Sequence, residues 1–217
     1  MGFVDLLKER AKKSIKTIVL PETEDMRTIE ATDKILKEGV AKIILIGNEE
    51  EINKKAAEGG FDISGATIVD PETSDRTQAY IDKFVELRAK KGMTPEKAKE
   101  ILHTQYPYYG VMMVKMGDAD GMVSGACHST ADTLRPCLQI LKTKPGTKLV
   151  SAFFLIVVPD CEYGANGAFV FADSGLNQNP TPEELSAIAA SSAESFQLLV
   201  QEEPVVAMLS HSTKGSA

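Results

Sequence analysis

The sequence predicts an α/β fold with a largely parallel sheet, and three observations indicate this class. Short runs of strand-forming residues alternate with longer segments whose apolar residues recur at helical spacing. Gly, Pro and helix-capping residues separate the runs. No internal repeat or low-complexity segment interrupts the alternation. Strands that alternate with helices of this length are typical of parallel sheets, because each helix returns the chain to the start of the next strand.

The elements are expected in the following order. The N-terminal residues predict an amphipathic helix with Phe3, Leu6 and Leu7 on one side. The expected strands are 17–20, 41–46, 66–69, 121–125, 149–158, 167–172 and 205–209, and the runs 149–158 and 167–172 could pair. The later helices are expected at 26–38, after Asn48, at 76–91, from Thr94, at 108–116, at 129–141 and from Thr181. The polar stretch 141–146, which contains Pro-Gly, is the best candidate for a domain boundary.

Capping residues support several of these helix boundaries. Asp25 can accept a hydrogen bond from the first free amides of the helix over 26–38, and Gly39 can end that helix. Thr94 is followed by Pro95, which suits the first helical position. Thr181 begins a Thr-Pro-Glu-Glu capping box.

The start of the helix over 129–141 stays open. If Ser129 is the cap, Pro136 lies inside the helix and should kink it. If Thr133 is the cap, Pro136 falls in the first turn, where it is tolerated, and Arg135 lies at the helix start. The sequence alone does not decide between the two starts.

Composition limits the kinds of protein this can be. The 217 residues include 24 Lys+Arg and 31 Asp+Glu, with a net charge of −7, which argues against a nucleic-acid binder. An anionic substrate remains compatible, because a few cations in a cleft can outweigh the overall charge. Hydrophobic residues make up 43%, enough for a sizeable core.

Cysteine use and hydropathy predict a cytoplasmic location. Cys127, Cys137 and Cys161 are too few and odd in number for a disulfide framework, so they are expected to be thiols in a reducing compartment. The N-terminus lacks the apolar run of a signal peptide. The longest apolar run, 149–159, is too short to span a bilayer.

The segment 120–136 is the first candidate for chemistry, since a strand runs into a Gly- and Ser-containing loop and then a helix. Such loops expose N–H groups to anions, and the helix dipole adds positive charge. Ser124 and Ser129 add hydroxyl donors, and Arg135 adds a guanidinium suited to phosphate. An ordinary strand-to-helix turn, with Arg135 in a surface salt bridge, explains the same residues.

Three other features carry weaker indications. The tail 210–217 contains Lys214, which could touch a phosphate or a pantetheine arm, but a plain turn is the simpler interpretation. Cys161 is flanked by two carboxylates, which oppose thiolate formation, so it is not expected to be a nucleophile. His128 beside Cys127 is the nearest approach to a metal motif, and no metal is predicted. Dinucleotide binding lacks a glycine fingerprint.

Six pieces of the sequence together resemble the phosphate acetyltransferase family. They are LPETEDMRT (20–28), ELRAKKGMT (86–94), DADGMVSGACHSTADTLRP (118–136), SAFFLIVVPDCEYG (151–164), FADSGLNQNPTPEE (171–184) and MLSHSTKGSA (208–217). They follow the family's order over essentially the whole chain. The phosphate butyryltransferases are a less good fit.

The resemblance implies a two-domain α/β architecture similar to the isocitrate/isopropylmalate dehydrogenases, usually in a homodimer. Residues 1–149 would form most of the first domain, and 150–217 would begin a second domain that is incomplete in this chain. The last strand leads into a loop with no helix after it, which also suggests a chain truncated at its C-terminus.

The resemblance also implies a mechanism. In a ternary complex within the interdomain cleft, the thiolate of coenzyme A attacks acetyl phosphate and phosphate leaves, with no tightly bound cofactor. Arg88 and Arg135 would bind the substrate phosphate, in a pocket lined by Ser124, Gly125 and Ser129. Cys161, Ser212 and Lys214 would lie near the site. The Asp that serves as base belongs to the part of the family beyond Ala217, so this chain alone should have little or no transferase activity.

Three alternatives stay open at this stage. One is an acyltransferase for butyryl groups, which would differ in its preferred acyl phosphate. Another is a non-catalytic module that only binds phosphate or coenzyme A. The third is a dehydrogenase of similar fold, against which the missing glycine fingerprint counts.

Overall fold

The computed structural model describes residues 2–147 and 149–209, which form two compact units. One unit is Lys8–Lys142, and the other comprises the described residues of Met1–Leu7 and Thr143–Ala217. The division after Lys142 falls inside the polar stretch 141–146. The domain boundary at 149/150 that the resemblance implies stays a prediction.

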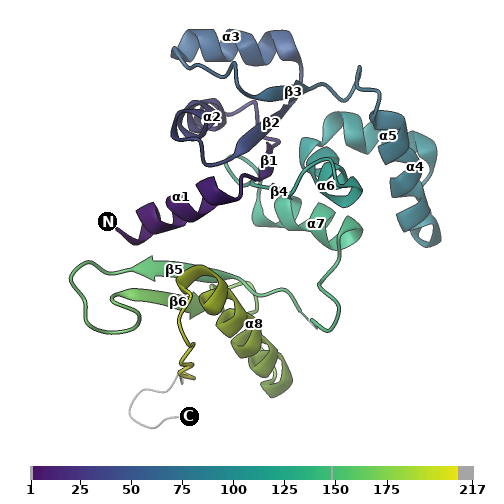
Figure 1. Cartoon of the computed structure of the whole chain (residues 1–217). Coiled ribbons are helices and arrows are strands. Elements are labelled where there is room, and N and C mark those ends of the chain that lie inside the picture. Colours follow the sequence, from purple (N-terminus) through teal and green to yellow (C-terminus); the bar gives the residue numbers. More distant parts are fainter. Residues whose placement is uncertain (1, 148, 210–217) are drawn as a thin grey trace. The chain divides into compact units, whose positions relative to one another are not determined.

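The larger unit is built on a four-stranded parallel sheet, which confirms the predicted α/β class (Figure 1). Its strands lie in the order β3-β2-β1-β4, and Val19 on β1 is level with Ile44 on β2 and Met122 on β4. The strands are β1 (Thr17–Leu20), β2 (Lys42–Ile46), β3 (Thr67–Val69) and β4 (Gly121–Met122).

Alternating side chains of β2 show that both faces of this sheet are covered. Ile43 and Leu45 pack in one buried cluster, with residues of α2 and α3, whereas Ile44 and Ile46 pack in another, with residues of α4 to α7. Both faces of a parallel sheet are expected to be buried in this way. The helices are α2 (Met26–Glu38), α3 (Glu49–Gly59), α4 (Thr77–Arg88), α5 (Pro95–Thr104), α6 (Tyr106–Met116) and α7 (Thr130–Ile140).

Most predicted helix boundaries are confirmed. The first helix, α1, spans Phe3–Lys13. Asp25 caps α2, which ends at Gly39 with a φ of 67°, and Thr94 caps α5. Ser129 accepts from the Asp132 amide and caps α7, so Pro136 lies inside that helix. The predicted helix over 76–91 ends earlier, because α4 stops at Arg88 and a 3₁₀ turn, Ala89–Lys91, follows.

The smaller unit contains β5 (Phe153–Val157) and β6 (Ala168–Ala172), which pair antiparallel as the sequence suggested, and α8 (Pro182–Val200), opened by the predicted capping box at Thr181. β5 is shorter than the expected strand over 149–158.

The predicted strand over 205–209 is wrong, since these residues have no regular structure. Val205 and Leu209 are 94% and 90% exposed. An apolar run becomes a strand only when another strand supplies backbone partners. Within the described residues, no helix has the length and hydropathy needed to cross a membrane.

Candidate functional site

The strand order of the larger unit points to one end of its sheet. From β1 the chain proceeds outward to β2 and β3, and β4 then returns to the other side of β1. In open α/β sheets, ligands bind beyond the carboxyl ends of the strands at such a reversal. Two segments leave neighbouring strands here, residues 21–25 after β1 and residues 123–129 after β4 (Figure 1).

Glu22, in the segment after β1, is a buried acid that binds the loop after β4. Its side chain is 3% exposed. Oε2 accepts the N–H groups of Gly125 at 2.6 Å and Ala126 at 2.8 Å. Oε1 accepts those of Cys127 at 3.0 Å and His128 at 2.9 Å. Four consecutive amides converging on one carboxylate form a backbone nest for an anion. The anion-friendly loop therefore holds the protein's own carboxylate.

Hydrogen bonding keeps Glu22 ionised. Burial by itself would raise its pKa, but the amides of residues 126–128 and the His128 ring hold the pKa of Glu22 well below its ordinary value. His128 Nδ1 lies 2.9 Å from Glu22 Oε1. A carboxylate accepts hydrogen bonds only, so at this distance His128 donates through Nδ1–H and adds a further hydrogen bond to Glu22.

Cys127 is held as a thiol beside these acids. Its Sγ lies 3.4 Å from Glu24 Oε1 and 3.6 Å from Glu22 Oε1. Burial, and then the hydrogen bond to Glu24, raise the pKa of Cys127 to about 12. A thiol that stays protonated at neutral pH is a poor nucleophile.

Donor atoms of Glu22, Cys127 and His128 lie within 4.8 Å of one another, as metal ligands would. A metal ligand needs a free lone pair and must lose its proton. The Glu22 oxygens are already occupied by N–H donors. The cluster is therefore better described as an internal hydrogen-bonded group than as a cation site. We call it the latch: the Glu22 carboxylate together with the amides of residues 125–128 that it binds.

The predicted phosphate-binding residues of this loop fall around the latch. Ser124 Oγ is buried and has no hydrogen-bond partner among the described residues. Gly125 has a φ of 115°, a conformation that favours glycine, and its amide is already bonded to Glu22. Ser129 caps α7, and its hydroxyl donates to Asp132. Arg135 is exposed and pairs with the same Asp132 at 3.1 Å.

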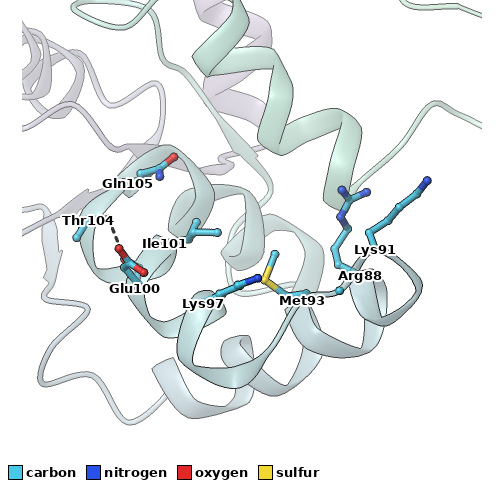
Figure 2. Close-up of a pocket in the computed structure, with 9 residues that line it drawn as sticks. Arg88, Lys91, Met93, Lys97, Glu100, Ile101, Thr104 and Gln105 are labelled. Carbon is cyan, nitrogen blue, oxygen red and sulfur yellow. Dashed lines mark hydrogen bonds between the residues drawn. The ribbon is translucent and has the colours of Figure 1, made fainter.

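Arg88 lines a separate cavity of about 270 Å³, between the end of α4 and α5 (Figure 2). Three cationic side chains, Arg88, Lys91 and Lys97, line it against one acid, Glu100. The Nε of Arg88 is buried and has no hydrogen-bond partner in the part of the chain that the structure describes. A buried guanidinium N–H without an acceptor is costly.

The phenol of Tyr108 is influenced by the positive charges of both Arg88 and Arg135. Burial raises the pKa of the Tyr108 phenol, and the positive charges of Arg135 and Arg88 partly oppose that rise. Both guanidinium groups therefore act on one phenol, which also lies 3.3 Å from Gln139 Oε1. The helices α4, α6 and α7 thus bring the electrostatic influence of Arg88 and Arg135 to the same region of this unit.

A second cavity, of about 320 Å³, lies near the ends of β1 and β2. His128 from the latch lines it together with Glu24, and Lys55 donates from its wall to the Thr23 carbonyl at 3.0 Å. His103 also lines this cavity, and its Nε2 is buried without a partner among the described residues. The latch therefore lies beside this second cavity, and α7, the helix that carries Arg135, follows it directly in the chain.

The other predicted residues lie elsewhere. Cys161 belongs to the smaller unit, where its Sγ lies 3.9 Å from the Tyr163 carbonyl. Ser212 and Lys214 lie outside the described residues.

Glu22 was missed by sequence reasoning, although it sits in the segment LPETEDMRT. A usable signal was present: an acid directly after a buried strand, in a sheet whose neighbouring strand ends in a Gly-containing loop.

Residues 2–217 match the sequence profile of the family described as Phosphate acetyl/butaryl transferase. The chain belongs to this family. A phosphate acetyltransferase of Acetivibrio thermocellus is 56% identical over 217 residues, which cover 100% of this chain and 64% of that protein. A solved phosphotransacetylase from Streptococcus pyogenes has a TM-score of 0.88 at 40% identity, over 99% of this chain and 63% of its own. The EutD phosphotransacetylase from Staphylococcus aureus gives 0.86 at 38%, over 99% and 62%.

Family membership confirms the resemblance found in the sequence, and the solved phosphotransacetylases confirm the fold class. The chain spans 64% of the length of the Acetivibrio thermocellus relative.

Proposed function

We propose that this chain contributes to a phosphate acetyltransferase, which moves an acetyl group between coenzyme A and inorganic phosphate. In the proposed ternary complex, the coenzyme A thiolate attacks the carbonyl carbon of acetyl phosphate. A C–S bond forms, the C–O bond to phosphate breaks, and phosphate leaves with the electron pair. The family and the names of its relatives support this reaction.

The observation that carries the proposal is the group of cationic side chains, Arg88, Lys91 and Lys97, that lines this cavity, where Arg88 also has a buried Nε without a partner among the described residues. A phosphate group supplies acceptors that a guanidinium binds in a fixed geometry, and positive charge stabilises the leaving phosphate in the transition state. We assign phosphate binding to Arg88 and Arg135. Ser124 Oγ, which is also buried without a partner among the described residues, is assigned as a further donor.

The remaining assignments rest on the family resemblance. Ser129 and Gly125 shape the loop beside these donors, and Cys161 lies near the site without acting as nucleophile. Coenzyme A is a substrate, and we propose no tightly bound cofactor. A homodimer and a cytoplasmic location complete the proposal. No residue of this chain is assigned as the base for the thiol.

Calorimetric titration with inorganic phosphate and with coenzyme A, beside an assay of thioester formation from acetyl phosphate, tests the function. We expect the chain to bind both ligands and to show little or no turnover, since the base is assigned to no residue here. Faster thioester formation from butyryl phosphate than from acetyl phosphate would favour the butyryl alternative. Absence of binding to either ligand would contradict the proposal.

A further inference from the structure

The latch formed by Glu22 and the amides of residues 125–128 holds a segment that the sheet itself holds weakly. β4 contains only Gly121 and Met122, and it is an edge strand whose sole neighbour in the described sheet is β1. Two residues of pairing leave the following loop with few backbone restraints from the sheet. Other contacts must therefore fix where the loop runs.

The segment after β1 supplies those contacts in two ways. Glu22 binds four consecutive N–H groups and the His128 ring. Arg27, at the start of α2, donates from Nη2 to the Ala126 carbonyl in the middle of the same loop. Glu22 thus binds N–H donors of this loop and Arg27 binds one of its carbonyl acceptors, and the two side chains are only five residues apart in the sequence.

The held segment lies between the residues assigned to phosphate. Ser124 comes directly before the nest, and Ser129 comes directly after it and caps α7. Arg135 is carried by that helix, and its partner Asp132 is also bound by the Ser129 hydroxyl. A shift of the loop would move the Ser124 hydroxyl, the cap and the helix start together.

We propose that Glu22 is a positioning residue for the transfer reaction. Its carboxylate fixes the loop over 125–128 and thereby places Ser124, Ser129 and Arg135 for phosphate. This inference rests on the proposed function. A purely structural explanation, in which Glu22 only stabilises the fold, predicts that its loss changes stability without a specific change in phosphate affinity.

The test compares Glu22→Gln with two other variants of the same chain. Glu22→Gln keeps the size of the side chain but replaces one acceptor oxygen by an NH₂ group that faces N–H donors. Asp33→Asn is the matched control, since Asp33 is also buried and also accepts a backbone N–H, that of Asp62. Arg27→Ala loosens the same loop from an exposed position, so it serves if Glu22→Gln fails to fold.

Two quantities are measured for each variant: hydrogen exchange of the amides of residues 125–128, and the Kd for inorganic phosphate. For Glu22→Gln we expect exchange faster and the Kd weaker by at least about tenfold each. Arg27→Ala should change both in the same direction by a smaller factor, and Asp33→Asn should change neither.

The outcomes separate this inference from the function it rests on. If wild-type protein binds phosphate and a variant with accelerated loop exchange keeps the wild-type Kd, the positioning role is wrong and the function stands. Unchanged exchange in Glu22→Gln would also overturn the positioning role. Failure of the wild-type chain to bind phosphate would overturn the inference together with the proposed phosphate binding.

Discussion

Replacement of Arg88 by Met should leave the fold as stable or more stable while it weakens phosphate binding. Arg88 Nε is buried without a partner among the described residues, and an unsatisfied buried donor costs about 1–3 kcal/mol. Met keeps the apolar stem and removes that donor. We therefore expect the free energy of unfolding to stay constant or rise by up to about 1 kcal/mol, after a discount for the lost contacts of the guanidinium.

The effect on binding should have the opposite sign. A hydrogen bond from a charged donor contributes about 1.5–3 kcal/mol, which corresponds to a Kd for phosphate weaker by about 10- to 150-fold. Calorimetric titration with phosphate gives the Kd, and urea unfolding gives the stability. Lys83→Met is the matched control, because Lys83 lies on the same helix, pairs with Glu86 and does not line the cavity.

The combination of signs makes this prediction easy to refute. A residue placed for the fold loses stability when it is replaced, whereas a residue placed for a ligand loses affinity and often gains stability. A drop of more than about 1 kcal/mol in the unfolding free energy of Arg88→Met, with phosphate affinity unchanged, would assign Arg88 to the fold. An equal loss of affinity in Lys83→Met would show that general charge, and not the buried guanidinium, attracts the anion.

Three further predictions concern other parts of the larger unit. Burial would raise the pKa of Asp118, but hydrogen bonds from Tyr80 and Arg76 hold that pKa below its ordinary value. The ionised Asp118 therefore stabilises the fold above about pH 4, and this stabilisation is lost as the pH falls through the folded pKa. When the free energy of unfolding is measured against pH, Asp118→Asn should show a smaller loss of stability in acid than the wild type. Because burial and hydrogen bonding to Glu24 and Glu22 raise the pKa of Cys127 to about 12, its alkylation by iodoacetamide at pH 8 should be at least about tenfold slower than that of a free thiol, and a rate near the free thiol's would contradict the geometry. Gly110→Ala should lower the unfolding free energy by about 1–3 kcal/mol in urea titrations, because the new Cβ would meet a methionine sulfur at 2.8 Å, and an unchanged stability would show that the core yields there.

Features that depend on neighbouring residues were predictable from the sequence. The caps at Asp25, Thr94 and Thr181 and the stop at Gly39 each need only a side chain or a glycine within a few residues of the helix end. The first residue of α7 could not be predicted from neighbouring residues alone, because Ser129 and Thr133 can both act as helix caps. The structure chooses Ser129, which places Pro136 in the helix interior.

Features that depend on distant partners were not predictable in this way. The run over 205–209 has the composition of a strand, but composition cannot supply the neighbouring strand that pairing requires. Glu22 is separated by about a hundred residues of chain from the amides it binds. Only the parallel pairing of β1 with β4 brings the two together, and that pairing is a property of the whole sheet.

The occupied nest limits which groups could serve the proposed phosphate site. A loop of this type would ordinarily offer its N–H groups to the ligand, as phosphate loops do. In this protein those amides are bound to Glu22, and its ionised carboxylate would also repel a second anion at the same place. The proposed recognition of phosphate therefore rests on side chains, and within the described residues Arg88 Nε and Ser124 Oγ are buried without partners. Guanidinium and hydroxyl donors can be removed by substitution, whereas backbone amides cannot, so the proposed site is open to the mutational tests set out above.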